Sequence, residues 1–231
     1  MFFSRFHYIS FYKGNRMAKS NEKWIWLPDW ASDLSLWQDD LTEVEPSANH
    51  TFIPYEVMAD NLDDLYKISG LAKADVVVGW GMGAFLLLKN HAKKPAAQRW
   101  ILLSPYADFC DEESDWTATN LHFMARQMQT TTEPGLNSFA EQFEDEFGEW
   151  QDDWMDCAKK MSAEKLARGI SYLADNQIVA PIENAKEIEV IYGRMDRAVP
   201  PVQTMKLREF LPNAEFKERP KAGHWPPQLL L

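Results

Sequence analysis

Three features of the sequence bring together residue types that could carry out nucleophilic, acid and base chemistry. The run Gly79-Trp80-Gly81-Met82-Gly83 follows the apolar run Val76-Val77-Val78, a layout that matches the strand, sharp turn and helix of the nucleophile elbow G-x-S-x-G. Asp196 and His224 follow later in the chain, each after a further apolar run. A nucleophile position, then an acid, then a histidine is the order of one class of catalytic triad. Position 81 is glycine, so the turn lacks the nucleophile itself.

These residues need a scaffold, and the hydrophobic pattern predicts strands alternating with helices. We expect strands over 23–28, 51–55, 75–80, 99–104, 187–192 and 214–219, and helices over 32–37, 61–71, 82–91 and 201–211. Several of the strands are continuously apolar, which indicates an α/β fold with a mostly parallel sheet covered by helices on both faces. Such sheets place their sites beyond the carboxyl ends of the strands, where Gly81, Asp196 and His224 are expected.

The strand pattern stops between positions 105 and 182, and this defines the expected domain organisation. Residues 1–22 are expected to form a flexible tail. Residues 23–105 and 182–231 form the α/β core, and residues 106–181 form a helical, acidic lid. Aromatic residues run through the lid and are available to pack: Trp116, Phe123, Phe139, Phe143, Phe147, Trp150 and Trp154.

Composition excludes several classes of protein. The net charge of −11 argues against nucleic acid as a partner, and no apolar run is long enough to cross a membrane. The two cysteines, Cys110 and Cys157, form neither a disulfide framework nor a metal-binding spacing, so we expect no metal and a cytoplasmic protein. Between Asp108 and Cys157 there are 14 acidic residues and one basic residue, Arg126, a run that is usually a solvated helical face.

The motifs resemble one family. The run from Gly79 to Gly83 is similar to G-W-S-x-G with one change, 192–200 is similar to Y-G-x-x-D-x-x-V-P, and 222–226 is similar to A-x-H-x-P. At these residues the chain resembles the α/β-hydrolase superfamily and, within it, the pimeloyl-[acyl-carrier protein] methyl ester esterase group of biotin synthesis. Pro28-Asp29-Trp30 stands where that group has its oxyanion loop, usually H-G-W-G. The likeness runs from about position 24 to position 226.

The resemblance implies roles for particular residues. His224 would be the general base, and Asp196 would orient its imidazole and stabilise its cation. The backbone N–H groups of Met82 and Trp30 would form the oxyanion hole. Trp80 would line the acyl pocket, although plain core packing explains it equally well. The expected substrate is an acyl ester, and no cofactor is implied.

The sequence departs from this pattern at the site itself. Gly81 has no side chain, so no acyl-enzyme can form there, and Ser104, the nearest hydroxyl by topology, lies in a Ser-Pro-Tyr turn that is not an elbow. A carboxylate at Asp29 would oppose the charge that an oxyanion hole stabilises, unless it turns outward. The family's helix after the histidine is also expected to be absent, because only seven residues follow His224.

Three hypotheses remain open. The chain is an acyl ester hydrolase that is weak or inactive as written, or a non-catalytic protein of the same fold, a pseudoenzyme, that binds an acyl ligand or a protein partner. In a third hypothesis, His224 and Asp196 activate water over the empty position 81. An acidic acyl carrier protein is disfavoured as a partner because the lid is itself acidic.

Overall fold

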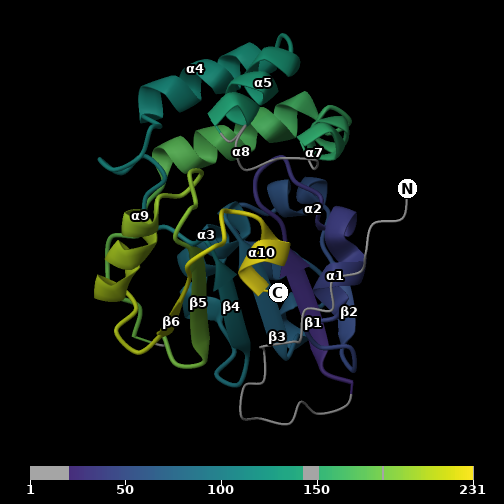
Figure 1. Cartoon of the computed structure of the whole chain (residues 1–231), viewed down its shortest axis with the longest axis vertical. Coiled ribbons are helices and arrows are strands. Elements are labelled where there is room, and N and C mark those ends of the chain that lie inside the picture. The colour runs from purple at the N-terminus through teal and green to yellow at the C-terminus, as the bar shows by residue number, and fades with distance from the viewer. Residues whose placement is uncertain (1–20, 143–150, 184, 231) are drawn as a thin grey trace.

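One parallel sheet forms the centre of the molecule. The computed structural model describes residues 21–142, 151–183 and 185–230. Within these residues, six parallel strands form a sheet in the order β2-β1-β3-β4-β5-β6 (Figure 1). Their bounds are β1 Lys23–Leu27, β2 Asn49–Phe52, β3 Val76–Trp80, β4 Arg99–Leu103, β5 Ile188–Gly193 and β6 Glu215–Arg219. The predicted α/β fold with a parallel sheet is therefore confirmed.

The strands nearest the centre of the sheet are the most apolar. All five residues of β3 are buried, as are four of the five residues of β4. Parallel strands with helices on both faces have no solvated side, which explains their continuous apolar runs. The core helices are α1 Gln38–Thr42, α2 Tyr55–Ala59, α3 Met82–Lys89, α9 Pro201–Lys206 and α10 Pro226–Leu230.

A group of helices is inserted between β4 and β5 and lies above one end of the sheet (Figure 1). It comprises α4 Ala118–Met128, α5 Glu133–Gln142, α7 Gln151–Ala158 and α8 Ala163–Asp175, and we call it the lid. The Thr117 side chain caps α4 and the Ser162 side chain caps α8. Of the aromatic residues expected to pack in the lid, Phe143, Phe147 and Trp150 lie outside the described residues.

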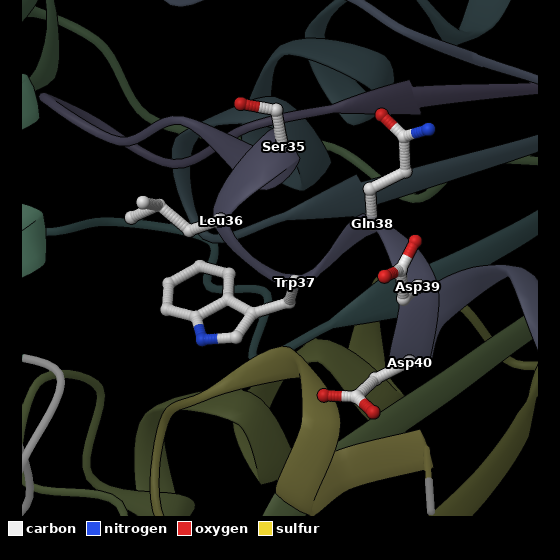
Figure 2. Close-up of a pocket in the computed structure, with 6 residues that line it drawn as sticks. All are labelled: Ser35, Leu36, Trp37, Gln38, Asp39 and Asp40. Carbon is white, nitrogen blue, oxygen red and sulfur yellow. The ribbon is translucent and has the colours of Figure 1, made fainter.

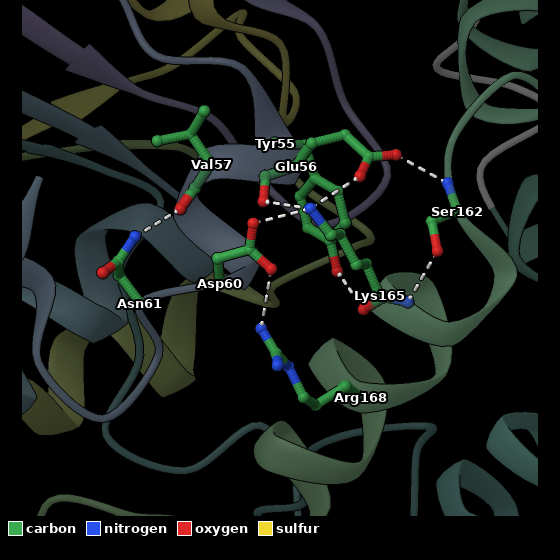
Figure 3. A network of polar contacts seen from close by, with 8 residues as sticks. All are labelled: Tyr55, Glu56, Val57, Asp60, Asn61, Ser162, Lys165 and Arg168. Carbon is green, nitrogen blue, oxygen red and sulfur yellow. Dashed lines mark hydrogen bonds and ion pairs between the residues drawn. The ribbon is translucent and has the colours of Figure 1, made fainter.

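The lid is attached to the core through a polar network between α8 and α2 (Figure 3). Lys165 Nζ contacts a carboxylate oxygen of Asp60 at 2.6 Å and one of Glu56 at 3.1 Å. The Tyr55 hydroxyl donates to the backbone carbonyl of Lys165 at 3.1 Å, and Arg168 pairs with Asp60 at 3.5 Å. The exposed ion pairs contribute little stability each, but together they fix where α8 sits.

The helix predicted over 61–71 is wrong. The segment forms two short 3₁₀ turns, Leu65–Lys67 and Leu71–Lys73, separated by Gly70 with φ of +88°. The apolar positions that suggested a helix are nevertheless buried: Leu62, Leu65, Ile68 and Leu71. A left-handed residue interrupts helical hydrogen bonding, and a short segment cannot recover the cost of starting a helix again.

One expectation concerns each end of the described chain, and the C-terminal one is wrong. A helix does follow His224, namely α10, and Gln228 Oε1 on this helix accepts a 2.8 Å hydrogen bond from the backbone of Gly223. The expected tail over 1–22 falls mostly on residues 1–20, which lie outside the described part. Glu22, however, forms a 2.8 Å ion pair with Arg99 and belongs to the core. At the other end, the hydrogen bond between Gly223 and Gln228 means that α10 supports the loop that carries His224.

Candidate active site

The turn between β3 and α3 has the geometry of a nucleophile elbow. Gly81 adopts φ of +50° and ψ of −111°, a conformation in which an L-residue is strained. A Cβ built at Gly79 would lie 2.8 Å from the backbone of Ala84, and one at Gly83 would lie 2.7 Å from the carbonyl oxygen of Leu27. The flanking glycines are thus required by the close approach of α3 to the strands.

The space that a nucleophile would need is filled by Asp29. A Cβ built on Gly81 would lie 2.2 Å from Asp29 Cγ and 2.4 Å from each carboxylate oxygen. Such distances are far below van der Waals contact, so a serine at position 81 and Asp29 in this rotamer exclude one another. Asp29 turns inward, into the position of the missing serine.

The Asp29 carboxylate contacts both predicted oxyanion-hole donors and the predicted general base. Asp29 Oδ1 accepts hydrogen bonds from the backbone N–H groups of Met82 at 2.6 Å and of Trp30 at 2.7 Å. Asp29 Oδ2 lies 2.9 Å from His224 Nε2. The two donors proposed for the oxyanion hole therefore converge on one point, and that point is occupied by a side chain of the protein.

The structure also brings Asp196 and His224 together. His224 Nδ1 lies 2.9 Å from Asp196 Oδ2, and Asp196 Oδ1 accepts a 2.8 Å hydrogen bond from the backbone of Val199. Both side chains are buried. Asp29, His224 and Asp196 form a continuous chain of hydrogen bonds that ties together the loops after β1, β5 and β6.

The electrostatics of this chain make His224 an acid rather than a base. Burial alone would lower the pKa of His224, but the charges and hydrogen bonds of Asp196 and then of Asp29 outweigh it and raise the pKa to about 10. His224 is therefore an imidazolium between two carboxylates at neutral pH. In this state its Nε2 can donate a proton and cannot accept one.

Trp80 supports the histidine loop. Its Nε1 donates to the backbone carbonyl of His224 at 3.0 Å, and its ring centroid lies 5.3 Å from that of His224. The ring also packs against Trp37 and Trp225, at centroid distances of 5.8 and 5.6 Å. These contacts account for Trp80 as a residue that positions His224, while its predicted place in an acyl pocket stays a prediction.

The structure also bears on the other candidate nucleophiles, which are water, Ser104 and the two cysteines. Water activated over an empty position 81 is excluded in this arrangement, because Asp29 fills that space. Ser104 is completely buried, with φ of +46°. Burial raises the pKa of the Cys110 thiol to about 11 and raises the pKa of the Cys157 thiol as well, so both are poor nucleophiles at neutral pH.

A row of aromatic rings lies between the lid and the loop that carries Asp29. Trp30 packs edge-on against Phe139 at a centroid distance of 4.9 Å, and Phe139 stacks on Trp116 at 5.7 Å and on Trp154 at 6.1 Å. Trp30 Nε1 donates to the carbonyl of Leu166 in α8 at 3.0 Å. The lid is therefore packed directly against the oxyanion loop.

Two surface pockets lie away from Asp29, Asp196 and His224. One, of about 520 Å³, is lined by six consecutive residues from Ser35 to Asp40 (Figure 2). The other, of about 360 Å³, lies on the lid beside Trp116 and Phe123. Neither is lined by Asp29 or His224. In residues 21–142, 151–183 and 185–230, no group of three or more His, Cys, Asp or Glu could hold a metal ion, and no helix is long and apolar enough to cross a membrane.

Sequence reasoning identified the oxyanion loop but missed the role of Asp29. The available signal was a pair of departures from the resembling family, an acid at 29 where the loop usually has glycine and a glycine at 81 where the elbow has serine. Taken together, they describe one side chain moved into the space left by another.

Comparisons with known proteins agree with this architecture. A model of the "Alpha/beta hydrolase family" matches residues 5–229. No curated protein sequence matches the chain. Among solved structures, an esterase (EaEST) from Exiguobacterium antarcticum is similar with a TM-score of 0.69 and 15% identity over 89% of this chain and 85% of that chain. A thermophilic esterase from Thermogutta terrifontis, with malate bound, has a TM-score of 0.66 and 18% identity over 91% and 85%. MenH from S. aureus has a TM-score of 0.64 and 15% identity over 90% and 88%.

Proposed function

Since the chain belongs to the alpha/beta hydrolase family, we propose that it is a carboxylic ester hydrolase that acts slowly on acyl esters. The site is formed by Asp29, His224 and Asp196. The observation that supports this proposal is the single Asp29 carboxylate held at once by both oxyanion-hole donors and by His224, at 2.6, 2.7 and 2.9 Å. Donors arranged in this way are positioned for charge on a reacting oxygen.

The proposed rate is low for a structural reason. Gly81 cannot form an acyl-enzyme, and the oxyanion hole is not free to receive a substrate oxygen while Asp29 occupies it. Enzymes that lose a member of the triad retain about 10³ to 10⁴-fold acceleration over water from the oxyanion hole and substrate binding. Because Asp29 occupies the hole here, we expect activity below that level and far below the rate of a serine esterase.

The substrate proposed is a free acyl ester. The resemblance to pimeloyl-[acyl-carrier protein] methyl ester esterases favours a medium-length acyl chain and a cytoplasmic reaction. The lid argues against the carrier-bound form, because α7 carries Asp152 and Asp153 in its first turn and lacks a basic residue in its last turn. An acidic carrier protein would be repelled by such a surface.

The proposal is tested by steady-state hydrolysis of p-nitrophenyl acetate. We expect saturable hydrolysis by the unmodified protein above the buffer rate, and loss of it in His224→Asn. Asp63→Asn, in an exposed turn of the core, is a matched control that should retain the activity. Hydrolysis no faster than the buffer, by a protein whose circular dichroism is that of a folded α/β domain, would refute the proposal.

A second candidate function is binding without turnover. It is favoured by the lid, which is held against the core by Lys165 and by the aromatic row around Phe139. In this reading the protein holds an acyl ligand or a partner and the buried ion pairs are structural. Calorimetric titration with octanoate, together with an assay of p-nitrophenyl octanoate hydrolysis, separates the two candidates, because octanoate binding with no cleavage of the aryl ester supports only the second.

A further inference from the structure

We propose that Asp29 is the nucleophile of this protein, supplied by the oxyanion loop in place of the serine that position 81 lacks. We infer further that its substrates are acyl esters with good leaving groups, such as aryl esters and thioesters. This inference rests on the proposed ester hydrolase function. It goes beyond that function by naming the reacting atom and the substrate class.

The Asp29 carboxylate occupies the place of the missing nucleophile. Both Asp29 oxygens lie 2.4 Å from the Cβ that a residue at position 81 would have, so they occupy the space of a serine hydroxyl. The Asp29 side chain remains 13% exposed, whereas that of Asp196 is 1% exposed. Of the two carboxylates on His224, Asp29 is therefore the more exposed, and we assign it as the one that a substrate reaches.

The two oxygens of Asp29 have different surroundings, and this assigns their roles. Oδ1 is held by the N–H groups of Met82 and Trp30, and Oδ2 faces His224. We assign Oδ2 as the attacking atom, because the imidazolium beside it can give a proton to the group that leaves. Oδ1 stays in the hole, where negative charge is stabilised.

The first step transfers the acyl group to Asp29. Asp29 Oδ2 attacks the carbonyl carbon of the ester, and the bond from that carbon to the alcohol or thiol breaks. The leaving group takes the proton of His224 Nε2. The products are a neutral imidazole, a free alcohol or thiol, and a mixed anhydride between Asp29 and the acyl group.

The second step uses the oxyanion hole. Neutral His224 takes a proton from water, and the water oxygen attacks Asp29 Cγ. The charge that develops on Oδ1 is received by the N–H groups of Met82 and Trp30, which already point at it. The bond between Cγ and Oδ2 then breaks, the acid leaves as a carboxylate with Oδ2, and Asp29 loses its remaining proton to solvent. The sum is ester plus water to acid plus alcohol.

The assignment of Oδ2 as the attacking atom and of Oδ1 to the oxyanion hole determines the substrate class. While Oδ1 occupies the oxyanion hole, the tetrahedral intermediate of the first step has no backbone donor for its own oxyanion. A carboxylate is also a better leaving group than an alkoxide, so the intermediate of a methyl ester returns to substrate even with His224 as the acid. Phenolates and thiolates leave far more easily, which favours aryl esters and thioesters.

The test follows oxygen in heavy-oxygen water. Stoichiometric enzyme is given p-nitrophenyl acetate for one turnover, then digested, and the peptide containing Asp29 and the released acetate are weighed by mass spectrometry. We expect one heavy oxygen in the Asp29 carboxylate and none in the acetate. Heavy oxygen in the acetate with an unlabelled Asp29 peptide would mean that water attacked the acyl carbon, of the ester or of the anhydride, and would overturn this two-step assignment.

Variants separate this inference from the function on which it rests. Asp29→Asn keeps the acceptor for Met82 and Trp30 and is expected to lower kcat at least about 100-fold, whereas Asp63→Asn is not. If Asp29→Asn does not fold, the labelling of the unmodified protein still decides the question. Hydrolysis that survives Asp29→Asn refutes the nucleophile alone, and absence of hydrolysis in the unmodified protein refutes both proposals.

Discussion

Placing the family's serine back at position 81 is expected to damage this protein rather than improve it. In Gly81→Ser the new Cβ would lie 2.2 Å from Asp29 Cγ, so the carboxylate must rotate out of its site. Rotation breaks its hydrogen bonds to Met82, Trp30 and His224. It also leaves the buried imidazolium with Asp196 as its remaining carboxylate.

The size of the effect follows from those contacts. Hydrogen bonds to a charged group contribute about 1.5–3 kcal/mol each, so losing three costs on the order of 5 kcal/mol. A side chain at the φ of +50° found at Gly81 adds roughly 1–3 kcal/mol of strain. Domains are stable by about 5–15 kcal/mol, so the loss is a large fraction of the total. For a chain of this length we expect Tm to fall by about 12–32 °C.

Urea denaturation of four proteins measures this directly: the unmodified chain, Gly81→Ser, Asp29→Gly and the double variant. Asp29→Gly removes the clash and gives the loop the glycine of the resembling family. The double variant should be more stable than Gly81→Ser alone, with a coupling free energy of about 3 kcal/mol. It should also hydrolyse p-nitrophenyl acetate faster than either single variant. A Gly81→Ser protein as stable as the unmodified chain, or additive effects in the cycle, would refute the steric argument.

Two further predictions concern the histidine and the lid. The pKa of His224 is raised to about 10 beside Asp196 and Asp29, from about 6.5 in an unfolded chain. The contribution of protonated His224 to the free energy of unfolding is therefore complete below pH 6.5 and is lost as pH rises to 10. Urea midpoints should fall across that window and fall less in His224→Asn; a midpoint that rises toward pH 10 in the unmodified protein would contradict the sign. Gly169→Ala would place a Cβ 2.2 Å from the Tyr55 hydroxyl and should destabilise the lid by about 1–3 kcal/mol, although alanine is the better helix former. Faster proteolysis within the lid would reveal the loss, and unchanged proteolysis would show that the lid can shift.

The sheet could be predicted from the sequence because its signals are local and mutually consistent. Val76-Val77-Val78 and Ile101-Leu102-Leu103 are continuous apolar runs, which suits strands buried on both faces. The sequence also placed Asp196 and His224 after successive strands, and parallel strands present their carboxyl ends at one edge. Proximity of those two side chains follows from topology alone.

The orientation of Asp29 could not be predicted in the same way. Its partners are Met82, 53 residues away, and His224, 195 residues away. Whether the carboxylate turns inward depends on an empty volume at Gly81 and on a cation at His224, both of which exist only after the sheet has assembled. The sequence pattern within the loop indicates neither the empty volume nor the cation.

The failed helix over 61–71 has a different cause. Its apolar spacing is real, and those side chains are buried as a helical pattern would require. However, Gly70 adopts φ of +88°, and tertiary packing satisfies the apolar face with two short turns instead. The apolar periodicity indicates which residues face the core. The conformation of Gly70 determines that two short turns, rather than one helix, place them there.

Because Asp29 and Gly81 share one volume, the two positions cannot be varied independently. A chain of this fold with serine at position 81 needs a small residue or a different rotamer at position 29, and a chain with an inward aspartate needs glycine at 81. The pair should therefore covary among homologues. Reading both positions at once would sort such sequences into those that present a hydroxyl at the elbow and those that present a carboxylate.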